Sequence, residues 1–170
     1  MIETLIDRDS ITERVAELGR EISEYYKERD FMLVMLANGG VFFGVDLARA
    51  ITIDFPMDII AAASYHNDRQ GDELIFRCSP KLDLKNKHIL LVDEVLDSGV
   101  TLARTVEELK KLGAEDVKTA VLVTKERARK PEALQCADWS GFTLPDVYLV
   151  GLGLDTNELC RNLPFLGVVK

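Results

Sequence analysis

Carboxylates, hydroxyls and a glycine follow a strongly apolar stretch near the middle of the chain. Residues 89–92, Ile-Leu-Leu-Val, are typical of a strand buried on both faces of a parallel sheet, and we expect it to end at Asp93. Helical spacing begins at Leu102 and continues to Leu112. The residues of interest in between are Asp93, Glu94, Asp97, Ser98, Gly99, Val100 and Thr101. They would lie at the carboxyl end of the strand, where open α/β sheets bind their ligands.

Segment 97–101 has the properties of a binding site for a phosphate monoester. A turn that leads into a helix offers unpaired backbone N–H groups and the positive end of the helix dipole, and Gly99 allows close approach of the backbone. The hydroxyls of Ser98 and Thr101 add donors. No lysine follows, so the nucleoside triphosphate loop GxxxxGK[ST] is absent. Because three carboxylates adjoin the segment, the ligand should carry hydroxyls or a cation beside its phosphate, as a ribose 5-phosphate does.

The string VDEVLDSGVT closely resembles the 5-phosphoribosyl-1-pyrophosphate (PRPP) motif of the type I phosphoribosyltransferases, in which two acids and two aliphatics precede D-[ST]-G-x-T. An acidic cap on an ordinary βα turn is the alternative, but capping preference explains only one or two of these residues. The resemblance extends from about Leu33 to the C-terminus. It implies a three-layer α/β fold with a mainly parallel central sheet flanked by helices. It further implies one domain over residues 1–170, with a small hood from the N- and C-terminal segments and a flexible flap.

Composition limits the class of protein. The chain has 170 residues, 47% of them hydrophobic, which suits one domain with a sizeable core. A net charge of −8 argues against a nucleic-acid surface. Cys78, Cys136 and Cys160 form no C-x-x-C pair, as expected of reduced thiols in the cytoplasm. The N-terminus lacks a signal pattern and no apolar stretch approaches the ~20 residues that span a bilayer, so we expect a cytoplasmic protein without membrane contact.

Hydrophobic periodicity predicts alternating helices and strands. A capping box at Ser10 and Glu13 should open the first helix, which continues to about Arg29. Gly113 is placed to end the helix that follows the central motif. The predicted strands are 31–37, 57–63, 74–78, 89–92, 117–124 and 146–150, and helical spacing also covers 41–51.

Two further loops join the site by resemblance. Asn38, Gly39 and Gly40 follow the first predicted strand, at the turn where the family holds pyrophosphate. Family members commonly have lysine at the position of Asn38. Backbone amides of the turn would therefore have to bind pyrophosphate here. A glycine needed only for positive φ is the alternative. Ser-Tyr followed by a polar loop resembles the family's flap, whose residues here are Ser64, Tyr65 and Arg69. A plain surface hairpin would explain the same pattern.

The resemblance also assigns the base and metal contacts. Lys125 would donate to the exocyclic oxygen of a 6-oxopurine, Trp139 would stack on the purine, and the backbone of Ser140 would read its edge. Asp155 would help Asp93 and Glu94 to hold Mg²⁺, and Arg161 would contact pyrophosphate. From the residues alone, Lys125 and Arg161 could be surface charges, Trp139 a core residue and Asp155 a turn cap.

The implied reaction joins hypoxanthine or guanine to PRPP, giving IMP or GMP and pyrophosphate, with Asp97 accepting the proton from N7 of the base. Xanthine or adenine specificity, or a non-catalytic PRPP-sensing regulator, are the alternatives. A dinucleotide-binding domain would need G-x-G-x-x-G after its first strand, which Asn38-Gly39-Gly40-Val41 does not supply. Relatives are usually dimers or tetramers, so we expect a homodimer or homotetramer.

Overall fold

The structure, a computed structural model, describes residues 1–65, 73–78 and 80–170. The strands of its central sheet are β2 (Phe31–Ala37), β3 (Met57–Tyr65), β4 (Glu73–Cys78), β5 (His88–Leu96), β6 (Asp116–Glu126) and β7 (Trp139–Pro145). They lie in the order β4-β3-β2-β5-β6-β7. All neighbouring pairs are parallel except β3 with β4. The prediction of an α/β fold with a mainly parallel sheet is therefore confirmed.

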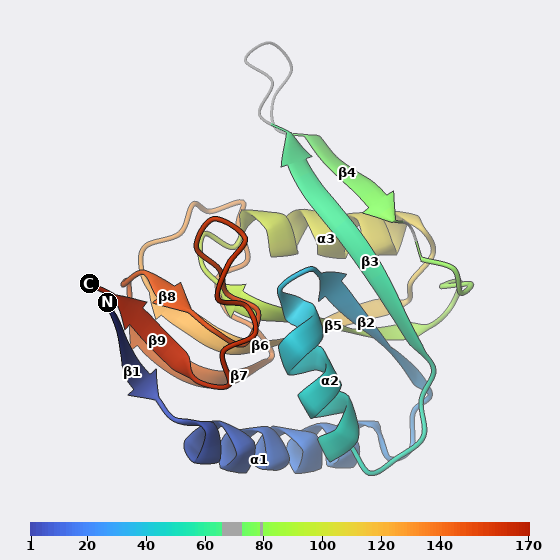
Figure 1. Ribbon diagram of the computed structural model, residues 1–170. Coiled ribbons are helices and arrows are strands. Elements are labelled where there is room, and N and C mark those ends of the chain that lie inside the picture. The colour runs from blue at the N-terminus through green and yellow to red at the C-terminus, as the bar shows by residue number, and fades with distance from the viewer. Residues whose placement is uncertain (66–72, 79) are drawn as a thin grey trace.

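Helices cover both faces of this sheet (Figure 1). They are α1 (Arg8–Tyr26), α2 (Gly40–Ala50) and α3 (Val100–Lys111). Successive residues of β2 point to opposite faces: Leu33 and Met35 belong to the hydrophobic cluster that contains α1 and α2, whereas Met32 and Val34 belong to the cluster that contains α3. Burial on both faces explains why the sequences of β2 and β5 are continuous apolar runs.

A second, small sheet is built from the two ends of the chain. Its strands are β1 (Ile2–Ile6), β8 (Leu149–Val150) and β9 (Leu166–Val169), in the antiparallel order β1-β9-β8. The termini therefore lie side by side, and the Lys170 amide donates to the Met1 carbonyl at 3.0 Å (Figure 1). Among the described residues, no helix is both long and apolar enough to cross a membrane.

Strands β3 and β4 form the predicted hairpin, which projects from the body of the molecule (Figure 1). Ser64 and Tyr65 end β3 and pair with Leu74 and Glu73 of β4. Arg69, the third residue predicted for the flap, lies outside the described residues.

Several elements differ from prediction in their boundaries or their presence. The cap of α1 is Asp7, whose Oδ1 accepts a hydrogen bond from the Ser10 amide at 2.8 Å, so the capping box predicted at Ser10 is wrong; α1 ends at Tyr26 instead of Arg29. Strand β5 continues past Asp93 to Leu96 because its last residues still pair with β6. Strand β7 was not predicted, and only Leu149 and Val150 of the strand expected at 146–150 are extended. As an edge strand, β7 has little buried surface to leave a hydrophobic pattern.

Candidate active site

A cleft of about 310 Å³ opens at the carboxyl ends of β2 and β5, beside the start of α3. Residues of the segment between β8 and β9 close its other side. The predicted site residues that line the cleft are Asn38, Gly39, Asp93, Glu94, Asp97, Ser98, Gly99, Thr101, Asp155 and Arg161. Residues from three separate segments of the chain thus meet at the sheet edge where α/β folds bind ligands.

The turn between β5 and α3 depends on a glycine. Gly99 is the N-cap of α3 and has φ of 74°, which L-residues with a Cβ rarely adopt. A Cβ at this position would also collide with the Leu134 carbonyl, while the Leu134 amide donates to the Gly99 carbonyl at 3.1 Å. Helix α3 starts at Val100, so its first backbone amides have no partners within the helix. They lie beside the turn that lines the cleft. This geometry suits an anion such as a phosphate.

Two adjacent acids lie at the bottom of the cleft. The Asp93 side chain is almost wholly buried, and its Oδ1 accepts a hydrogen bond from the Glu94 amide at 2.9 Å. Burial raises the pKa of Asp93 well above its ordinary value, and the neighbouring negative charge of Glu94 raises it further. The buried carboxyl therefore ionises most readily when a cation or a donor from a ligand is present.

Glycines allow three loops to meet beside these acids. A Cβ on Gly39 would collide with the Glu94 carboxylate, and a Cβ on Gly40 would lie 2.9 Å from the Asp93 Cα. Gly153 packs against the Gly39 carbonyl with φ of 99°. The peptide bond that precedes Asn38 is cis. Backbone atoms of the turn at 38–40 therefore lie directly against the carboxylates.

Arg161 provides a cation at the cleft wall. Its Nη1 donates to the Gly153 carbonyl at 2.6 Å, and its Nη2 lies 2.9 Å from both Asp155 Oδ1 and Glu158 Oε2. Burial disfavours the charge, but the hydrogen bond with Glu158 and the charge of Asp155 outweigh it and raise the pKa of Arg161. The guanidinium is thus held in place by protein groups and lies close enough to the cleft to attract an anion.

The Asp97 carboxylate forms ion pairs with two cations, Lys125 and Arg127. Lys125 Nζ lies 3.3 Å from Asp97 Oδ2, and Arg127 Nη1 lies 2.6 Å from Asp97 Oδ1. Both cations also approach Asp146, at 3.6 Å and 3.7 Å. Partial burial raises the pKa of Asp97, but the hydrogen bond from Arg127 and the charge of Lys125 outweigh it, so the pKa is lowered overall. The structure therefore brings Lys125 to Asp97, as the predicted base site requires.

Trp139 is separated from this site, which contradicts the stacking role predicted for it, whereas Ser140 bonds the neighbour of Lys125 through its side chain. They begin β7, and Trp139 pairs in register with Ala120, five residues before Lys125 in β6. Five residues of strand span roughly 16 Å, so Trp139 lies toward the amino-terminal ends of the strands, away from Lys125. The Trp139 ring packs at 5.2 Å from the Tyr25 ring, and the Ser140 hydroxyl bonds Thr124 at 2.8 Å.

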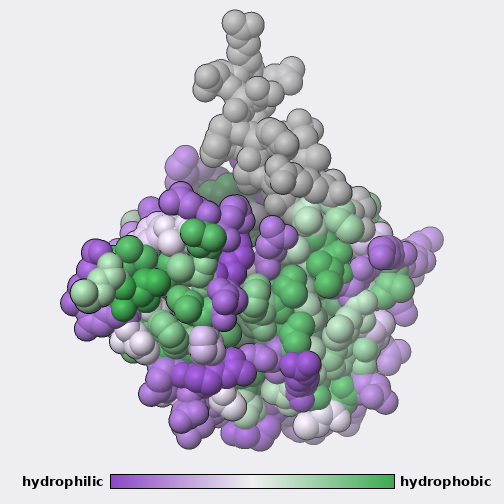
Figure 2. All heavy atoms as spheres, viewed as in Figure 1, coloured by the Kyte–Doolittle hydropathy of each residue, from purple (hydrophilic) through white to green (hydrophobic). Residues whose placement is uncertain are grey.

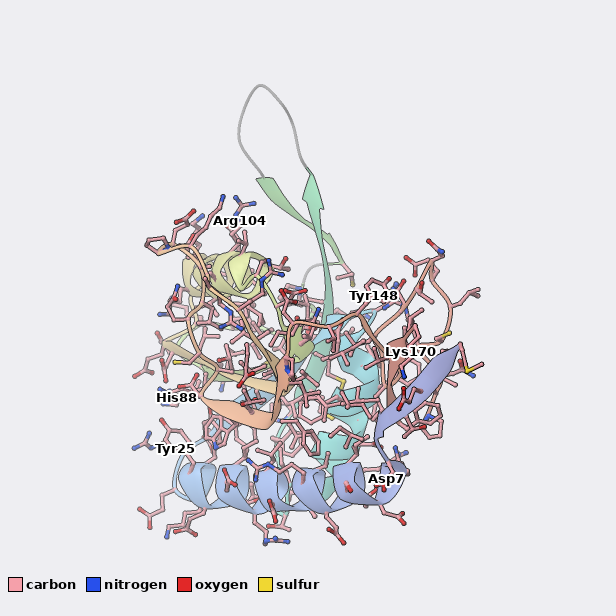
Figure 3. The ribbon with its side chains drawn as sticks, turned by 90° about the vertical axis from the view of Figure 1, so that its left-hand side faces the viewer. Asp7, Tyr25, His88, Arg104, Tyr148 and Lys170 are labelled. Atoms are coloured by element: carbon pink, nitrogen blue, oxygen red, sulfur yellow. The ribbon has the colours of Figure 1, made fainter. Side chains whose placement is uncertain are left out.

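Tyr148, an aromatic residue that the sequence analysis did not select, contacts the backbone of Asp155, which lines the cleft. It follows Asp146 by two residues, its side chain is 56% exposed, and its hydroxyl donates to the Asp155 carbonyl at 3.2 Å. Figure 3 shows Tyr25, the neighbour of Trp139, at one end of α1, and Tyr148 apart from it, higher in the view. The position of Tyr148 just after the carboxyl end of β7 was the signal that could have identified it, but β7 itself was not predicted.

Within the described part of the chain, no three His, Cys, Asp or Glu side chains cluster closely enough to hold a metal ion by themselves. Asp93, Glu94 and Asp155 nevertheless share the lining of the same cleft. Mg²⁺ commonly binds through one or two carboxylates, its own waters and the phosphates of a substrate. This donor set therefore fits a magnesium ion that arrives with a phosphorylated ligand.

Comparisons with known proteins agree with this geometry. Residues 3–157 match the family described as phosphoribosyl transferase domain. Hypoxanthine-guanine phosphoribosyltransferase of Streptococcus pneumoniae is 33% identical over 169 residues, covering 99% of this chain and 93% of that protein. Hypoxanthine phosphoribosyltransferase of Escherichia coli is 33% identical over 172 residues, covering 99% and 95%. A crystal structure of a Staphylococcus aureus hypoxanthine phosphoribosyltransferase superposes with a TM-score of 0.91 at 28% identity, covering 99% of this chain and 91% of that one. The chain therefore belongs to the phosphoribosyltransferase family.

Proposed function

We propose that this enzyme transfers the 5-phosphoribosyl group of PRPP to N9 of hypoxanthine or guanine, releasing IMP or GMP and pyrophosphate. The observation that carries the proposal is the meeting, in one cleft, of a phosphate-binding helix start, a pair of acids and the Asp97–Lys125 ion pair. The names of the relatives at 33% identity support the same reaction.

The 5-phosphate would bind at residues 97–101. The backbone amides after Gly99 and the hydroxyls of Ser98 and Thr101 would donate to its oxygens, with Val100 contributing through its amide. Asp93 and Glu94, directly beside this segment, would accept hydrogen bonds from the ribose hydroxyls. The phosphate thus fixes one end of the ribose while the acids orient its ring.

Departure of pyrophosphate leaves positive charge on the ribose ring, so the site has to stabilise a cation beside a polyanion. The acids lie on the cation side. Arg161 and the backbone of Asn38, Gly39 and Gly40 would lie on the polyanion side, with Arg161 as the positive charge there.

Asp155, Asp93 and Glu94 are the residues that would hold Mg²⁺ together with the substrate. The ion would neutralise part of the negative charge of pyrophosphate as it leaves. For the protein itself the consequence concerns Asp93, because a cation beside its buried carboxyl favours the ionised form.

The purine would lie over Asp97 and Lys125. Asp97 would accept the proton from N7 as N9 attacks, and the Lys125 ammonium would donate to the oxygen at C6. A donor at that position disfavours adenine, which presents an amino group there. The exposed ring of Tyr148 takes the stacking role that Trp139 cannot fill from its position toward the amino-terminal ends of the strands.

The β3–β4 hairpin and the small sheet would complete the active site from outside the cleft. Ser64, Tyr65 and Arg69 would belong to a flap that excludes water during reaction, and the small sheet would form the hood.

A homodimer or homotetramer in the cytoplasm is the expected form. Figure 2 shows apolar residues on the surface over the small sheet and α2, where Leu5 and Phe42 are exposed. Such patches often mark contact surfaces, and light scattering would measure the assembly.

The proposal is tested by incubating the protein with magnesium, PRPP and each of hypoxanthine, guanine, xanthine and adenine, and measuring nucleotide formation. We expect products from the first two bases. Asp97→Asn should reduce kcat by roughly 10²–10⁴-fold, the usual contribution of a general base. Nucleotide formation from adenine alone would contradict the base assignment, and full activity of Asp97→Asn would contradict the role of Asp97.

A further inference from the structure

Segment 127–138, between β6 and β7, packs against the back of the phosphate-binding turn. The Leu134 amide donates a hydrogen bond to the Gly99 carbonyl, and the Leu134 carbonyl lies where a Cβ on that glycine would be. Arg129 in the same segment makes four hydrogen bonds, all to main-chain carbonyls. The reaction proposed above uses neither residue, so their arrangement calls for a separate explanation.

The bonds of Arg129 join three stretches of chain. Its Nε donates to the Asp97 carbonyl at 2.9 Å, and its Nη2 donates to the Leu96 carbonyl at 3.0 Å. Nη2 also donates to the Lys125 carbonyl at 2.7 Å, and Nη1 to the Gln135 carbonyl at 3.3 Å. The first two carbonyls lead into the phosphate-binding turn, and the third belongs to the lysine of the base site. We call this set of contacts the Arg129 clamp.

We propose that Arg129 is a positioning residue that fixes the phosphate-binding turn relative to the base-binding lysine, and thereby sets the affinity for the phosphoribosyl group. The inference rests on the proposed function for the identity of the two ligand ends. A guanidinium has five N–H donors, and the clamp uses four of them on the protein itself. Arg129 is therefore committed to the protein backbone and acts through Asp97 and Lys125.

The shape of the guanidinium matters here as much as its charge. A planar fork can reach carbonyls on several segments at once, whereas the ammonium of a lysine is a single point at the end of a flexible stem. Lysine at position 129 would keep the positive charge near the phosphate but could not join the Leu96, Asp97 and Lys125 carbonyls together with Gln135. A charge effect and a positioning effect can therefore be told apart by substitution.

Arg14 provides a matched control. It also donates from a partly buried guanidinium to two backbone carbonyls, those of Gly141 at 3.0 Å and Ser140 at 2.9 Å, and so ties α1 to β7. Ser140 pairs with Val121 of β6, four residues before Lys125, so these contacts lie roughly 13 Å along the strand from the base-site lysine. Loss of Arg14 should lower Tm without changing the affinity for phosphate, which separates a general loss of stability from a local one.

The experiment compares wild type, Arg129→Gln, Arg129→Lys and Arg14→Gln. It measures Tm, the Kd for ribose 5-phosphate by calorimetry, and kcat and KM for PRPP with hypoxanthine. In Arg129→Gln we expect Kd and KM for PRPP to rise about tenfold or more, the equivalent of about 1.4 kcal/mol. Arg129→Lys should stay close to the Gln variant, and Arg14→Gln should keep the wild-type Kd at a lower Tm.

Several results would overturn the clamp. One is an unchanged Kd and KM in Arg129→Gln. Another is a wild-type Kd and KM in Arg129→Lys, which would indicate that the charge alone matters. The third is a rise of Kd in Arg14→Gln equal to that in Arg129→Gln. Failure of the proposed function looks different. Wild type would then bind ribose 5-phosphate without forming nucleotide, and the Kd series would still test the clamp. A wild type that fails to bind ribose 5-phosphate would contradict both.

Discussion

Asp97 has to be ionised to accept a proton, and its surroundings in the free protein keep it so. Arg127 and Lys125 outweigh the effect of burial and lower the pKa of Asp97. A lowered pKa also makes a carboxylate a weaker base, so the same contacts that guarantee ionisation limit its strength. Lys125 is expected to turn toward the purine, which leaves Arg127 as the cation that stays with Asp97.

We predict that Arg127→Gln raises the pKa of Asp97. The acid limb of kcat/KM for hypoxanthine, which reports groups of the enzyme before the base binds, should then lie at higher pH than in wild type. Arg127→Lys, which keeps the charge, should resemble wild type. The measurement is a pH series of kcat/KM on the three proteins, and identical acid limbs in all of them would contradict the assigned role of Arg127.

The lowered pKa of Asp97 also makes the stability of the fold depend on pH. Because the pKa of Asp97 is lower in the folded than in the unfolded chain, its ion pairs stabilise the fold above the unfolded pKa and cease to do so as pH falls through the lowered value. Asp97 is 40% exposed, so solvent weakens this contribution.

Trp139 and Tyr148 show which residue roles were hidden from the sequence. Both are aromatics in the same C-terminal stretch, but the register of β7 on β6 places Trp139 beside Ala120, whereas the Tyr148 hydroxyl bonds the backbone of Asp155. Pairing of an edge strand depends on contacts between distant residues, and the pattern of β7 itself is weak. Arg129 was hidden for a related reason, since its carbonyl partners include residues more than thirty positions away.

At the scale of elements, the turn from β5 into α3 was the easiest to predict. Its strand is buried on both faces, so the apolar run is continuous, and the acids and hydroxyls follow it directly. The end of α3 was also predicted correctly, because Gly113 has the positive φ of a C′ glycine. Sequence fails to fix the boundary where two nearby residues could each cap a helix, as Asp7 and Ser10 could for α1.

The two glycines that flank α3 allow a matched prediction. Gly99 and Gly113 both have positive φ, so alanine at either costs roughly 1–2 kcal/mol of backbone strain, which is roughly 2–4 °C in Tm per kcal/mol for a chain of this length. Alanine at position 99 would also collide with the Leu134 carbonyl, whereas the nearest atom at position 113 is 3.3 Å away. Gly99→Ala should therefore raise KM for PRPP at least tenfold, and Gly113→Ala should only lower Tm. Equal KM values in the two variants would argue against a role of the turn in binding phosphate.

At the scale of the whole molecule, the two sheets supply opposite sides of one cleft. The central sheet presents Asp93, Glu94 and Asp97 at the ends of its parallel strands, and the segment between β8 and β9 of the small sheet presents Asp155 and Arg161. The N-terminal strand β1 pairs with β9, so both ends of the chain help to hold that segment. The ligand should accordingly span from the helix start of α3 toward Tyr148, whose hydroxyl donates to the Asp155 carbonyl.

A crystal structure of the protein with bound IMP measures that placement directly. We predict that the 5-phosphate lies within hydrogen-bond distance, about 2.7–3.2 Å, of backbone amides in segment 98–101. The purine should stack on Tyr148, with its C6 oxygen at Lys125 and N7 at Asp97. A nucleotide whose phosphate lies elsewhere, with segment 98–101 in contact with protein or water alone, would contradict the account.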